Sequence, residues 1–312
     1  MPRAFVFPGQ GSQAVGMGKT LAEAFASARE VFGEVDEALS FNLSRLMFEG
    51  PESQLTLTEN AQPALMAVSL AVLRVLERDA GLRTGKALKF VAGHSLGEYS
   101  ALAAVGTFTL ADAARLLRRR GQAMQQAVPV GVGAMAALLG AEIAVARELA
   151  EAAAGREVCE VANDNAPGQI VLSGHASAVE RAIELAKERK LKAIRLPVSA
   201  PFHCRLMAPA AVAMREALDD IVMRAPAVPV VCNVEARAAS DPADLKSLLV
   251  RQVTGLVRWR ESVLYMKAEG VDTLVEVGAG KVLSGMVKRI DRELTSLAVG
   301  TPADIEAYVK AG

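Results

Sequence analysis

Residues 89–104 read KFVAGHSLGEYSALAA, and this stretch decides the fold. A short apolar run is followed by the pentapeptide Gly-x-Ser-x-Gly over residues 93–97, and a helix-prone segment comes next. This order is typical of a nucleophile elbow, in which two glycines let the chain turn sharply without a Cβ clash. The elbow would hold Ser95 on a strained corner with its hydroxyl exposed and a helix N-terminus behind it. The sequence therefore indicates acyl-transfer chemistry with Ser95 as the nucleophile.

The composition is that of a globular protein without a bias toward a charged partner. Of the 312 residues, 52% are hydrophobic, which excludes disorder and suffices for one large domain or two unequal ones. Lys and Arg together number 35, and Asp and Glu also number 35. Neither nucleic acid nor an anionic membrane is therefore expected as the main partner. No heptad pattern or long exposed strand edge stands out, and we expect a monomer.

The sequence also carries expectations about location. The N-terminus has a short apolar run and no small-residue cleavage site, so we expect a first strand there and no signal peptide. The longest uncharged stretch, residues 121–141, contains glutamines, a proline and glycines, which make it a poor membrane-spanning helix. Cys159, Cys204 and Cys232 lack CxxC spacing and fit a reducing compartment as small buried residues. We expect a soluble, cytoplasmic protein with no metal site.

Strand-like and helix-like segments alternate in the first part of the chain, as in an α/β fold around a mostly parallel sheet. Strands are predicted over residues 5–7 and 90–92, and helices over residues 62–79, with Pro63 in the first turn, and 110–128. After residue 199 the same alternation returns. There we predict buried strands over residues 230–234 and 273–277 and a helix over residues 262–269.

The rhythm changes between these two parts. The predicted order there is strand 134–139, helix 142–154, strands 158–162 and 169–173, helix 176–190 and strand 193–198. This βαββαβ order is that of a ferredoxin-like unit. We therefore predict a large α/β subdomain formed by residues 1–128 and 199–312, with an inserted small subdomain over residues 129–198. The cleft between the two is the expected binding site.

A serine hydroxyl needs a base to accept its proton, and the chain offers three histidines. His94 adjoins the nucleophile and is expected to point elsewhere on the turn, and His175 opens a helix of the insert. His203 lies where the chain crosses from the insert back to the large subdomain, and a residue there faces the cleft. A lone histidine is more often structural, but His203 is the only plausible partner for an elbow serine.

Acyl transfer also needs hydrogen-bond donors where negative charge develops on the carbonyl oxygen. An elbow supplies the backbone N–H of the residue after the nucleophile, here Leu96. The loop after the first strand, residues 8–13, should reach the same crevice, because the carboxyl ends of parallel strands meet at one edge of a sheet. Gln10 is the candidate for a second donor. The alternative is a glycine-rich turn in which the Gln10 amide is solvated.

Three consecutive arginines differ in helical phase. Arg120 falls on the same face as Leu117 and Met124, whereas Arg118 and Arg119 are expected on the solvated surface. A buried guanidinium is costly unless it is paired, and no carboxylate lies three or four residues from Arg120. The pattern leaves two possibilities open. Arg120 either forms a salt bridge with a core acid or reaches the cleft, where its planar fork would hold a carboxylate of the acyl group.

Taken together, these motifs resemble the malonyl-CoA:acyl-carrier-protein transacylase family over essentially the whole chain. The segments that carry the resemblance are Phe7-Pro8-Gly9-Gln10-Gly11-Ser12-Gln13, Thr58-Glu59-Asn60-Ala61-Gln62-Pro63-Ala64, Gly93-His94-Ser95-Leu96-Gly97-Glu98-Tyr99, Arg120-Gly121-x-x-Met124-Gln125, Asn163-x-x-x-Pro167-Gly168-Gln169, Phe202-His203 and Glu276-Val277-Gly278. The resemblance implies an α/β-hydrolase-like large subdomain with a parallel sheet and an inserted ferredoxin-like subdomain.

The resemblance also implies roles for single residues. Ser95 would be the nucleophile and His203 the base, while Gln10 and the Leu96 N–H would form the oxyanion hole. Arg120 would hold the malonyl carboxylate.

Three further residues follow from the same resemblance. The backbone carbonyl of Gln252 would orient the histidine in place of a triad aspartate. We also expect His94 and Phe202 in the substrate site, since in related polyketide acyltransferases a Phe before the histidine goes with malonyl over methylmalonyl groups.

The implied reaction is a two-step exchange through malonyl-Ser95, in which coenzyme A leaves and the phosphopantetheine thiol of acyl carrier protein takes the acyl group for fatty acid biosynthesis. It would need no metal or redox cofactor. Carrier proteins are acidic, so a basic surface should meet one. The candidate cluster is Lys187, Arg189, Lys190 and Lys192. A solvated helix end explains that cluster equally well.

Two other functions remain open from sequence. A serine esterase or thioesterase would use the same elbow with water as acceptor and would not need Arg120. A non-catalytic domain that binds carrier protein would need neither a nucleophile nor a base.

Overall fold

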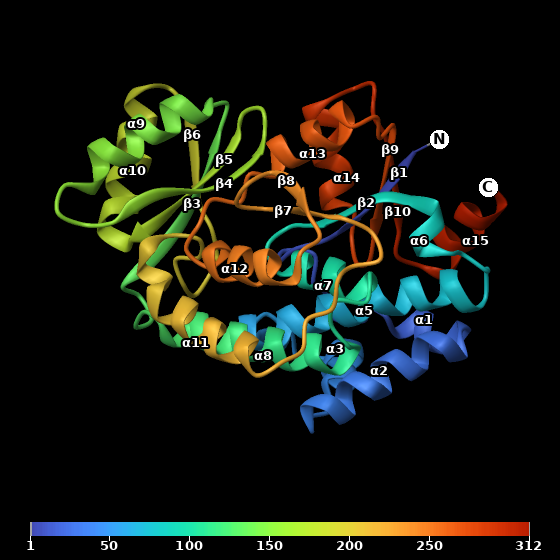
Figure 1. The fold of residues 1–312 in the computed structure, drawn as a ribbon. Coiled ribbons are helices and arrows are strands. Elements are labelled where there is room, and N and C mark those ends of the chain that lie inside the picture. Colours follow the sequence, from blue (N-terminus) through green and yellow to red (C-terminus); the bar gives the residue numbers. More distant parts are fainter. Residues whose placement is uncertain (1, 312) are drawn as a thin grey trace.

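The computed structural model describes residues 2–311, which form two β-sheets with helices packed on them (Figure 1). The larger sheet has six strands and the smaller has four. The four strands of the small sheet and two helices come from one continuous segment, which Figure 1 shows in green to yellow at one end of the molecule. The structure is thus an α/β fold with a parallel-rich sheet and a separate antiparallel sheet, as predicted.

The large sheet has the strand order β10-β9-β1-β2-β7-β8. Its strands are β1 (Arg3–Phe7), β2 (Leu88–Gly93), β7 (Val230–Cys232), β8 (Arg237–Ala239), β9 (Thr273–Val277) and β10 (Thr295–Val299). All neighbours pair in parallel except β7 and β8. In β1, Phe5 and Phe7 belong to the core on one face of the sheet, and Ala4 and Val6 to the core on the other. Both faces are therefore covered, which explains the continuous apolar runs of these strands.

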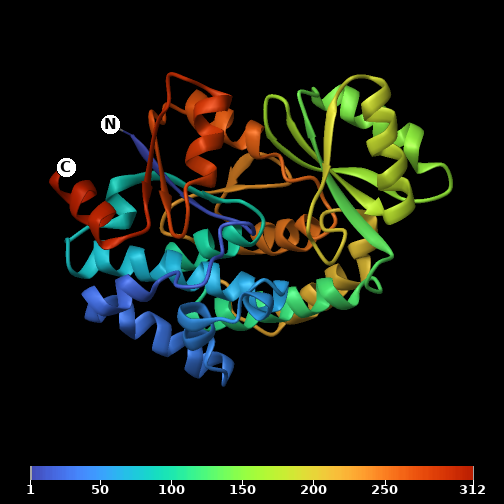
Figure 2. The same cartoon turned by 180° about the vertical axis from the view of Figure 1, so that it is seen from behind.

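Helices cover the large sheet on both sides (Figures 1 and 2). One face packs on α13 (Trp259–Ala268) and α14 (Val282–Ile290). The other helices that follow the strands of this sheet are α1 (Lys19–Ala24), α2 (Ala26–Leu39), α3 (Leu43–Glu49), α4 (Glu52–Leu55), α5 (Thr58–Arg78), α6 (Thr84–Ala87), α7 (Leu96–Ala104), α8 (Leu110–Gln126), α11 (Ala208–Asp219), which a short 3₁₀ turn (Arg205–Met207) precedes, α12 (Pro242–Gln252) and α15 (Pro302–Lys310).

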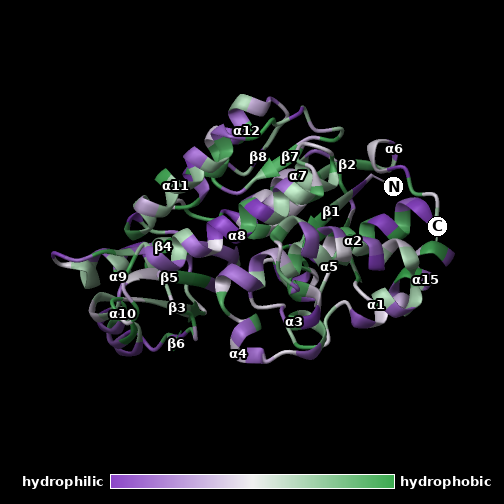
Figure 3. Cartoon of the chain, turned by 90° about the horizontal axis from the view of Figure 1, so that it is seen from below, coloured by the Kyte–Doolittle hydropathy of each residue, from purple (hydrophilic) through white to green (hydrophobic). Residues whose placement is uncertain are grey.

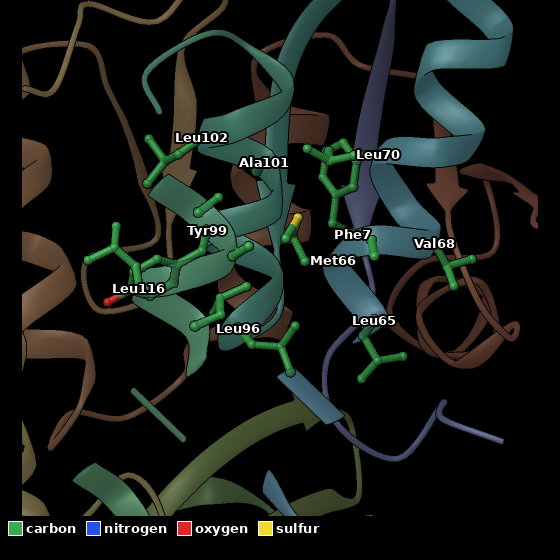
Figure 4. Close-up of a cluster of buried hydrophobic side chains, with 14 of the residues drawn as sticks. Phe7, Leu65, Met66, Val68, Leu70, Leu96, Tyr99, Ala101, Leu102 and Leu116 are labelled. Carbon is green, nitrogen blue, oxygen red and sulfur yellow. The ribbon is translucent and has the colours of Figure 1, made fainter. Parts of the chain in front are cut away.

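The main core lies between the sheet and α5 and α7. Figure 4 shows Leu65 and Met66 of α5 and Leu96 and Tyr99 of α7 gathered around Phe7 of β1. All five side chains are at most 1% exposed. In Figure 3, hydrophilic and hydrophobic residues alternate along the outer helices. Among residues 2–311, no helix is both long enough and apolar enough to cross a bilayer.

The small sheet has the strand order β4-β5-β3-β6, and all its neighbours are antiparallel. Its elements are β3 (Gly133–Leu139), α9 (Ile143–Ala154), β4 (Cys159–Ala166), β5 (Gln169–His175), α10 (Ala176–Glu188) and β6 (Lys192–Arg195). The predicted βαββαβ order is confirmed. Along β3, Ala134, Ala136 and Leu138 pack under α9 and α10, whereas Met135 joins the core of the large subdomain. The second face of this sheet thus turns toward the elbow.

Several predicted boundaries are wrong by three or four residues. Strand β4 extends to Ala166, beyond the predicted end at residue 162, and α13 begins at Trp259, before the predicted start at residue 262. The long helix begins at Thr58, four residues earlier than predicted, and Pro63 lies inside it. Strand β6 ends at Arg195 although the prediction ran to residue 198, because Pro197 has no N–H with which to continue the ladder. Leu196, Pro197 and Val198, which follow the end of β6, line the cavity between the two sheets.

The elbow depends on two close backbone approaches. Ser95 has φ 54° and ψ −109°, a strained conformation for a residue with a side chain. A Cβ on Gly93 would lie 1.9 Å from the carbonyl oxygen of Gly97, and one on Gly97 would lie 2.2 Å from the carbonyl oxygen of Phe7. Only glycine fits at either position, so β1, β2 and α7 converge tightly beneath Ser95.

Replacing Gly97 with Ala should destabilise the protein by about 3 kcal/mol, because the overlap is with backbone that cannot move aside. The matched control is Gly33→Ala in α2, where a Cβ meets no atom within 4 Å. The control should stabilise the protein by up to about 1 kcal/mol through helix propensity. Urea unfolding of both variants measures the difference, and equal stabilities would contradict the close approach.

Candidate active site

A cavity of about 540 Å³ lies between the two subdomains at the carboxyl end of the parallel strands. Ser95 and Gln10 line it from the large subdomain, and Met135 and Val171 line it from the small sheet. Ligands of open α/β sheets bind at this edge, because the loops that follow neighbouring parallel strands meet there. The cavity is thus where the sequence places the binding cleft.

Ser95 and His203 lie in hydrogen-bond contact inside the cavity. The Ser95 Oγ is 2.7 Å from the Nε2 of His203, and the Nδ1 of the same ring is 3.0 Å from the carbonyl oxygen of Gln252. A carbonyl oxygen only accepts, so Nδ1 carries the proton and Nε2 presents a lone pair to the serine hydroxyl. This geometry would let His203 act as a general base for Ser95. Within residues 2–311 the ring is oriented by a backbone carbonyl and by no carboxylate.

The environment keeps the His203 ring neutral. Burial, and then the positive charge of Arg120, lower its pKa to about 3. The imidazole is only 4% exposed. A neutral ring is the form that accepts a proton, so His203 is in the state required of a base at neutral pH.

Arg120 is fully buried and points at the nucleophile. Its Nη1 donates to the Oε1 of Gln62 at 2.7 Å, and its Nη2 donates to the Oε1 of Gln252 at 2.9 Å and to the Ser95 Oγ at 3.1 Å. The guanidinium also lies over the ring of Tyr99, 5.6 Å from its centroid. Every acceptor is neutral.

The possibility of a core salt bridge is therefore wrong. Within residues 2–311 the Arg120 guanidinium has no ion-pair partner, and its Nε has no hydrogen-bond partner. A buried cation that touches only neutral oxygens remains able to bind an anion that enters the cavity.

The neighbouring arginines behave differently from one another. Arg119 is exposed, as predicted. Arg118 is not free on the surface: it donates to the side chain of Asn60, lies 3.7 Å from Glu59 and stacks over Phe41. The helical phase could not show this, because these partners come from α5 and from the loop before α3.

The two predicted oxyanion donors are near Ser95. Leu96 is the first residue of α7, and its N–H has no acceptor within its own helix. Gln10 is exposed on the cavity wall, and its Oε1 accepts a hydrogen bond from the Thr58 hydroxyl at 3.1 Å. The hydrogen bond from Thr58 thus holds the oxygen of the Gln10 side-chain amide.

His94 and Phe202 also line the cavity. The Nε2 of His94 is 2.8 Å from the Oδ1 of Asn165, and its ring lies 5.7 Å from that of Trp259. Burial lowers the pKa of His94. Phe202 is 8% exposed. Both side chains shape the wall and neither touches the Ser95 hydroxyl.

Sequence reasoning missed two buried residues that hold the elbow. The Asn233 side chain accepts from the Ser95 N–H at 2.7 Å and donates to the carbonyl of Gly93 at 2.7 Å. The Oε2 of Glu98 accepts from the Asn233 N–H at 2.8 Å and from the Gln252 Nε2 at 3.0 Å. Gln252 in turn donates to the carbonyl of Ser95 at 3.0 Å.

The sequence contains a signal for each of these two residues. Asn233 directly follows the buried strand β7 at the same edge of the sheet. Glu98 stands three residues after Ser95, the spacing of a helix capping box, but its carboxylate turns to Asn233 instead of the Ser95 N–H. Burial raises the pKa of Glu98 to about 7.

The predicted basic cluster lies away from the cavity. Lys187 pairs with Glu184 at 2.6 Å, and Arg189 pairs with Glu148 at 3.0 Å. Lys192 is opposite Leu139, at the far end of β3 from Met135. Two of the four basic residues of the cluster are therefore paired with acidic residues of the same subdomain.

Comparison with known proteins identifies the family. The family described as "Acyl transferase domain" matches residues 4–303. The chain belongs to this acyl transferase family. A "Malonyl CoA-acyl carrier protein transacylase" of Bacillus subtilis (strain 168) is 47% identical over 309 residues, which cover 98% of this chain and 96% of that protein.

Solved structures from the family have the same fold. The acyl-carrier-protein-S-malonyltransferase of Bartonella henselae is 57% identical, with a TM-score of 0.97 over 100% of this chain and 99% of that one. A structure titled "PlMCAT:AntF (holo): type II PKS acyl-carrier protein in complex with its malonyl-transacylase" is 40% identical, with a TM-score of 0.96 over 100% of both chains.

The buried neutral His203 should make the protein sensitive to acid. The unfolded chain binds a proton near pH 6.5, whereas the folded state does so only near pH 3. The free energy of unfolding should therefore fall as the pH drops through this window, by about 1.4 kcal/mol per pH unit for this one group. His203→Asn should remove this contribution, and Asn tolerates the positive φ of 58° at this position.

Urea unfolding of wild type and His203→Asn between pH 6.5 and 4 measures the effect as a difference. Glu98, whose raised pKa makes stability fall as the pH rises toward about 7, contributes to both proteins and cancels. Ser95→Ala keeps the imidazole buried and should retain the wild-type response. Parallel losses in wild type and His203→Asn would contradict the shift.

Proposed function

We propose that this acyl transferase moves a malonyl group from coenzyme A to the phosphopantetheine thiol of acyl carrier protein, in fatty acid biosynthesis. The observation that carries the proposal is Arg120, a buried guanidinium without a carboxylate partner within the described chain, 3.1 Å from the Ser95 hydroxyl. An acyl group with its own carboxylate would complete that site. The printed names of the relatives, which include a transacylase bound to its carrier protein, support the donor and the acceptor.

In the first step, the Ser95 oxygen attacks the thioester carbonyl while the Nε2 of His203 accepts the hydroxyl proton. The Leu96 N–H and the Gln10 amide donate to the oxygen of the tetrahedral intermediate. The carbon–sulfur bond then breaks, the sulfur takes the proton from His203, and coenzyme A leaves as the free thiol. The product is malonyl-Ser95.

The second step reverses the first with a different thiol. His203 accepts the proton of the phosphopantetheine thiol, whose sulfur attacks malonyl-Ser95, and Ser95 regains its proton as the ester bond breaks. One acyl-enzyme shared by two substrates gives ping-pong kinetics. The hydrogen bond from Nδ1 to the Gln252 carbonyl keeps the ring in the same tautomer through both steps.

The remaining features of the proposal follow from this chemistry. Transfer between a thioester and an ester changes no oxidation state, so we propose no redox cofactor, and Arg120 supplies the positive charge for which a metal would otherwise serve. We propose a monomer that meets its carrier protein transiently. A cytoplasmic location is supported by the three unpaired, buried cysteines.

The covalent intermediate can be tested directly. Intact-mass spectrometry after mixing the protein with malonyl-CoA should show one malonyl adduct on the wild type and none on Ser95→Ala, since the alanine has no nucleophile. Addition of carrier protein with its phosphopantetheine arm should remove the adduct and transfer it to the carrier. Absence of the adduct from the wild type would refute the proposal, and release of free malonate in place of transfer would favour a thioesterase.

Arg120→Ala should abolish the preference for a charged acyl group. Loss of two charged hydrogen bonds should lower the ratio of kcat/KM for malonyl-CoA over acetyl-CoA by at least about 100-fold. The matched control is Arg119→Ala, one residue earlier and exposed, which should leave the ratio unchanged. Steady-state kinetics with both thioesters measure it, and an unchanged ratio in Arg120→Ala would rule out the carboxylate contact.

A further inference from the structure

We propose that Thr58 and Gln62 are positioning residues that aim the amide of Gln10 at the reacting carbonyl. The proposal rests on the function proposed above, in which Gln10 donates to the oxyanion. It concerns the segment of residues 58–64, which the sequence singles out and whose polar side chains have no part in the two chemical steps. Hydrogen bonds run from Arg120 through Gln62 and Thr58 to Gln10, and their donor-to-acceptor direction is set at the Arg120 end.

The direction is set by Arg120, because a guanidinium has only donors. Its Nη1 lies 2.7 Å from the Gln62 side chain, so the atom that it meets there must be the oxygen Oε1. The amide nitrogen of Gln62 is thereby turned the other way. It donates to the Thr58 Oγ1 at 2.9 Å.

The Thr58 hydroxyl continues the chain of hydrogen bonds in the same donor-to-acceptor direction. Since its oxygen already accepts from Gln62, its single proton is free to point to Gln10, and the Gln10 Oε1 is 3.1 Å away. Within residues 2–311, that oxygen is the one acceptor for the Thr58 hydroxyl. Gln10 must therefore present its oxygen to Thr58, and its NH2 group remains available as a donor on the cavity wall that it shares with Ser95.

Burial explains why two intermediates are needed. Thr58 and Gln62 are each 1% exposed, one turn apart at the start of α5, whereas Gln10 is exposed on a loop. An exposed amide held by nothing would rotate, and half of its orientations would turn an oxygen toward the developing oxyanion. The buried pair connects the exposed Gln10 amide to the buried Arg120 guanidinium. Hydrogen bonds aligned in one direction also polarise one another, which makes the terminal donor stronger.

Thr58→Val tests the relay, because it replaces the hydroxyl by a methyl group at nearly constant volume. We expect the rate constant for formation of malonyl-Ser95 from malonyl-CoA, and kcat, to fall about tenfold, below the 100-fold or greater loss typical of a deleted oxyanion donor. KM for malonyl-CoA should stay within about twofold, since Arg120 is untouched. Thr58→Ser, which restores the hydroxyl, should recover most of the rate.

The control and a double mutant separate this role from a general effect on the core. Thr107→Val deletes another buried threonine hydroxyl, one without a partner among the described residues, and should leave kcat unchanged. In a Gln10→Ala background, Thr58→Val should have no further effect, since Thr58 acts through Gln10. Thr58→Ala, which cannot overpack, replaces Thr58→Val if the latter does not fold.

Three results would overturn the relay: an unchanged rate in Thr58→Val, a failure of Thr58→Ser to restore it, or additive losses in the double mutant. Each is read against a wild type that forms malonyl-Ser95. A wild type that forms no adduct refutes the proposed function itself, so the two failures are distinguishable.

Discussion

The active site is organised around one buried cation. Burial removes the Arg120 guanidinium from water, and no carboxylate of residues 2–311 pairs with it. Neutral oxygens of Gln62, Gln252 and Ser95 offset part of the desolvation cost. Each of these oxygens belongs to a group that has a second task. Gln252 also accepts from His203 through its backbone, and Gln62 connects to Thr58. The charge of Arg120 thus orders the residues around it.

A second requirement is imposed on the backbone of the elbow. Ser95 adopts a positive φ, and both of its peptide groups are held, the N–H by Asn233 and the carbonyl by Gln252. Glu98 accepts from both of these residues. A strained conformation persists only where its surroundings determine it fully. The Ser95 hydroxyl does not cap its helix, because Asn233, which follows β7, and Gln252 of α12 hold the Ser95 backbone instead.

The small subdomain completes the site without contributing to this network of charges. Met135 of β3 and Val171 of β5 project from the face of the small sheet opposite α9 and α10, and they line the apolar wall across from the nucleophile. Excluding water from this side strengthens the electrostatic interactions between Arg120 and any bound anion. The insert therefore lines the cavity with the face of its sheet that α9 and α10 do not cover. Alternation along the strands predicts two faces, but only the tertiary structure shows which of them meets the large subdomain.

Local sequence determined the order of elements and the position of Ser95 at the elbow. The alternation of apolar runs predicts both subdomains, and Gly-x-Ser-x-Gly after a strand predicts the elbow, because glycine spacing and strand periodicity are short-range properties. The tertiary structure alone decided what surrounds Ser95. Asn233 and Glu98, the neutral partners of Arg120 and the contact of Arg118 with Asn60 join segments up to 154 residues apart. Pairing of buried polar groups depends on which side chains meet across the core. The periodicity of a single helix or strand carries no information about those partners.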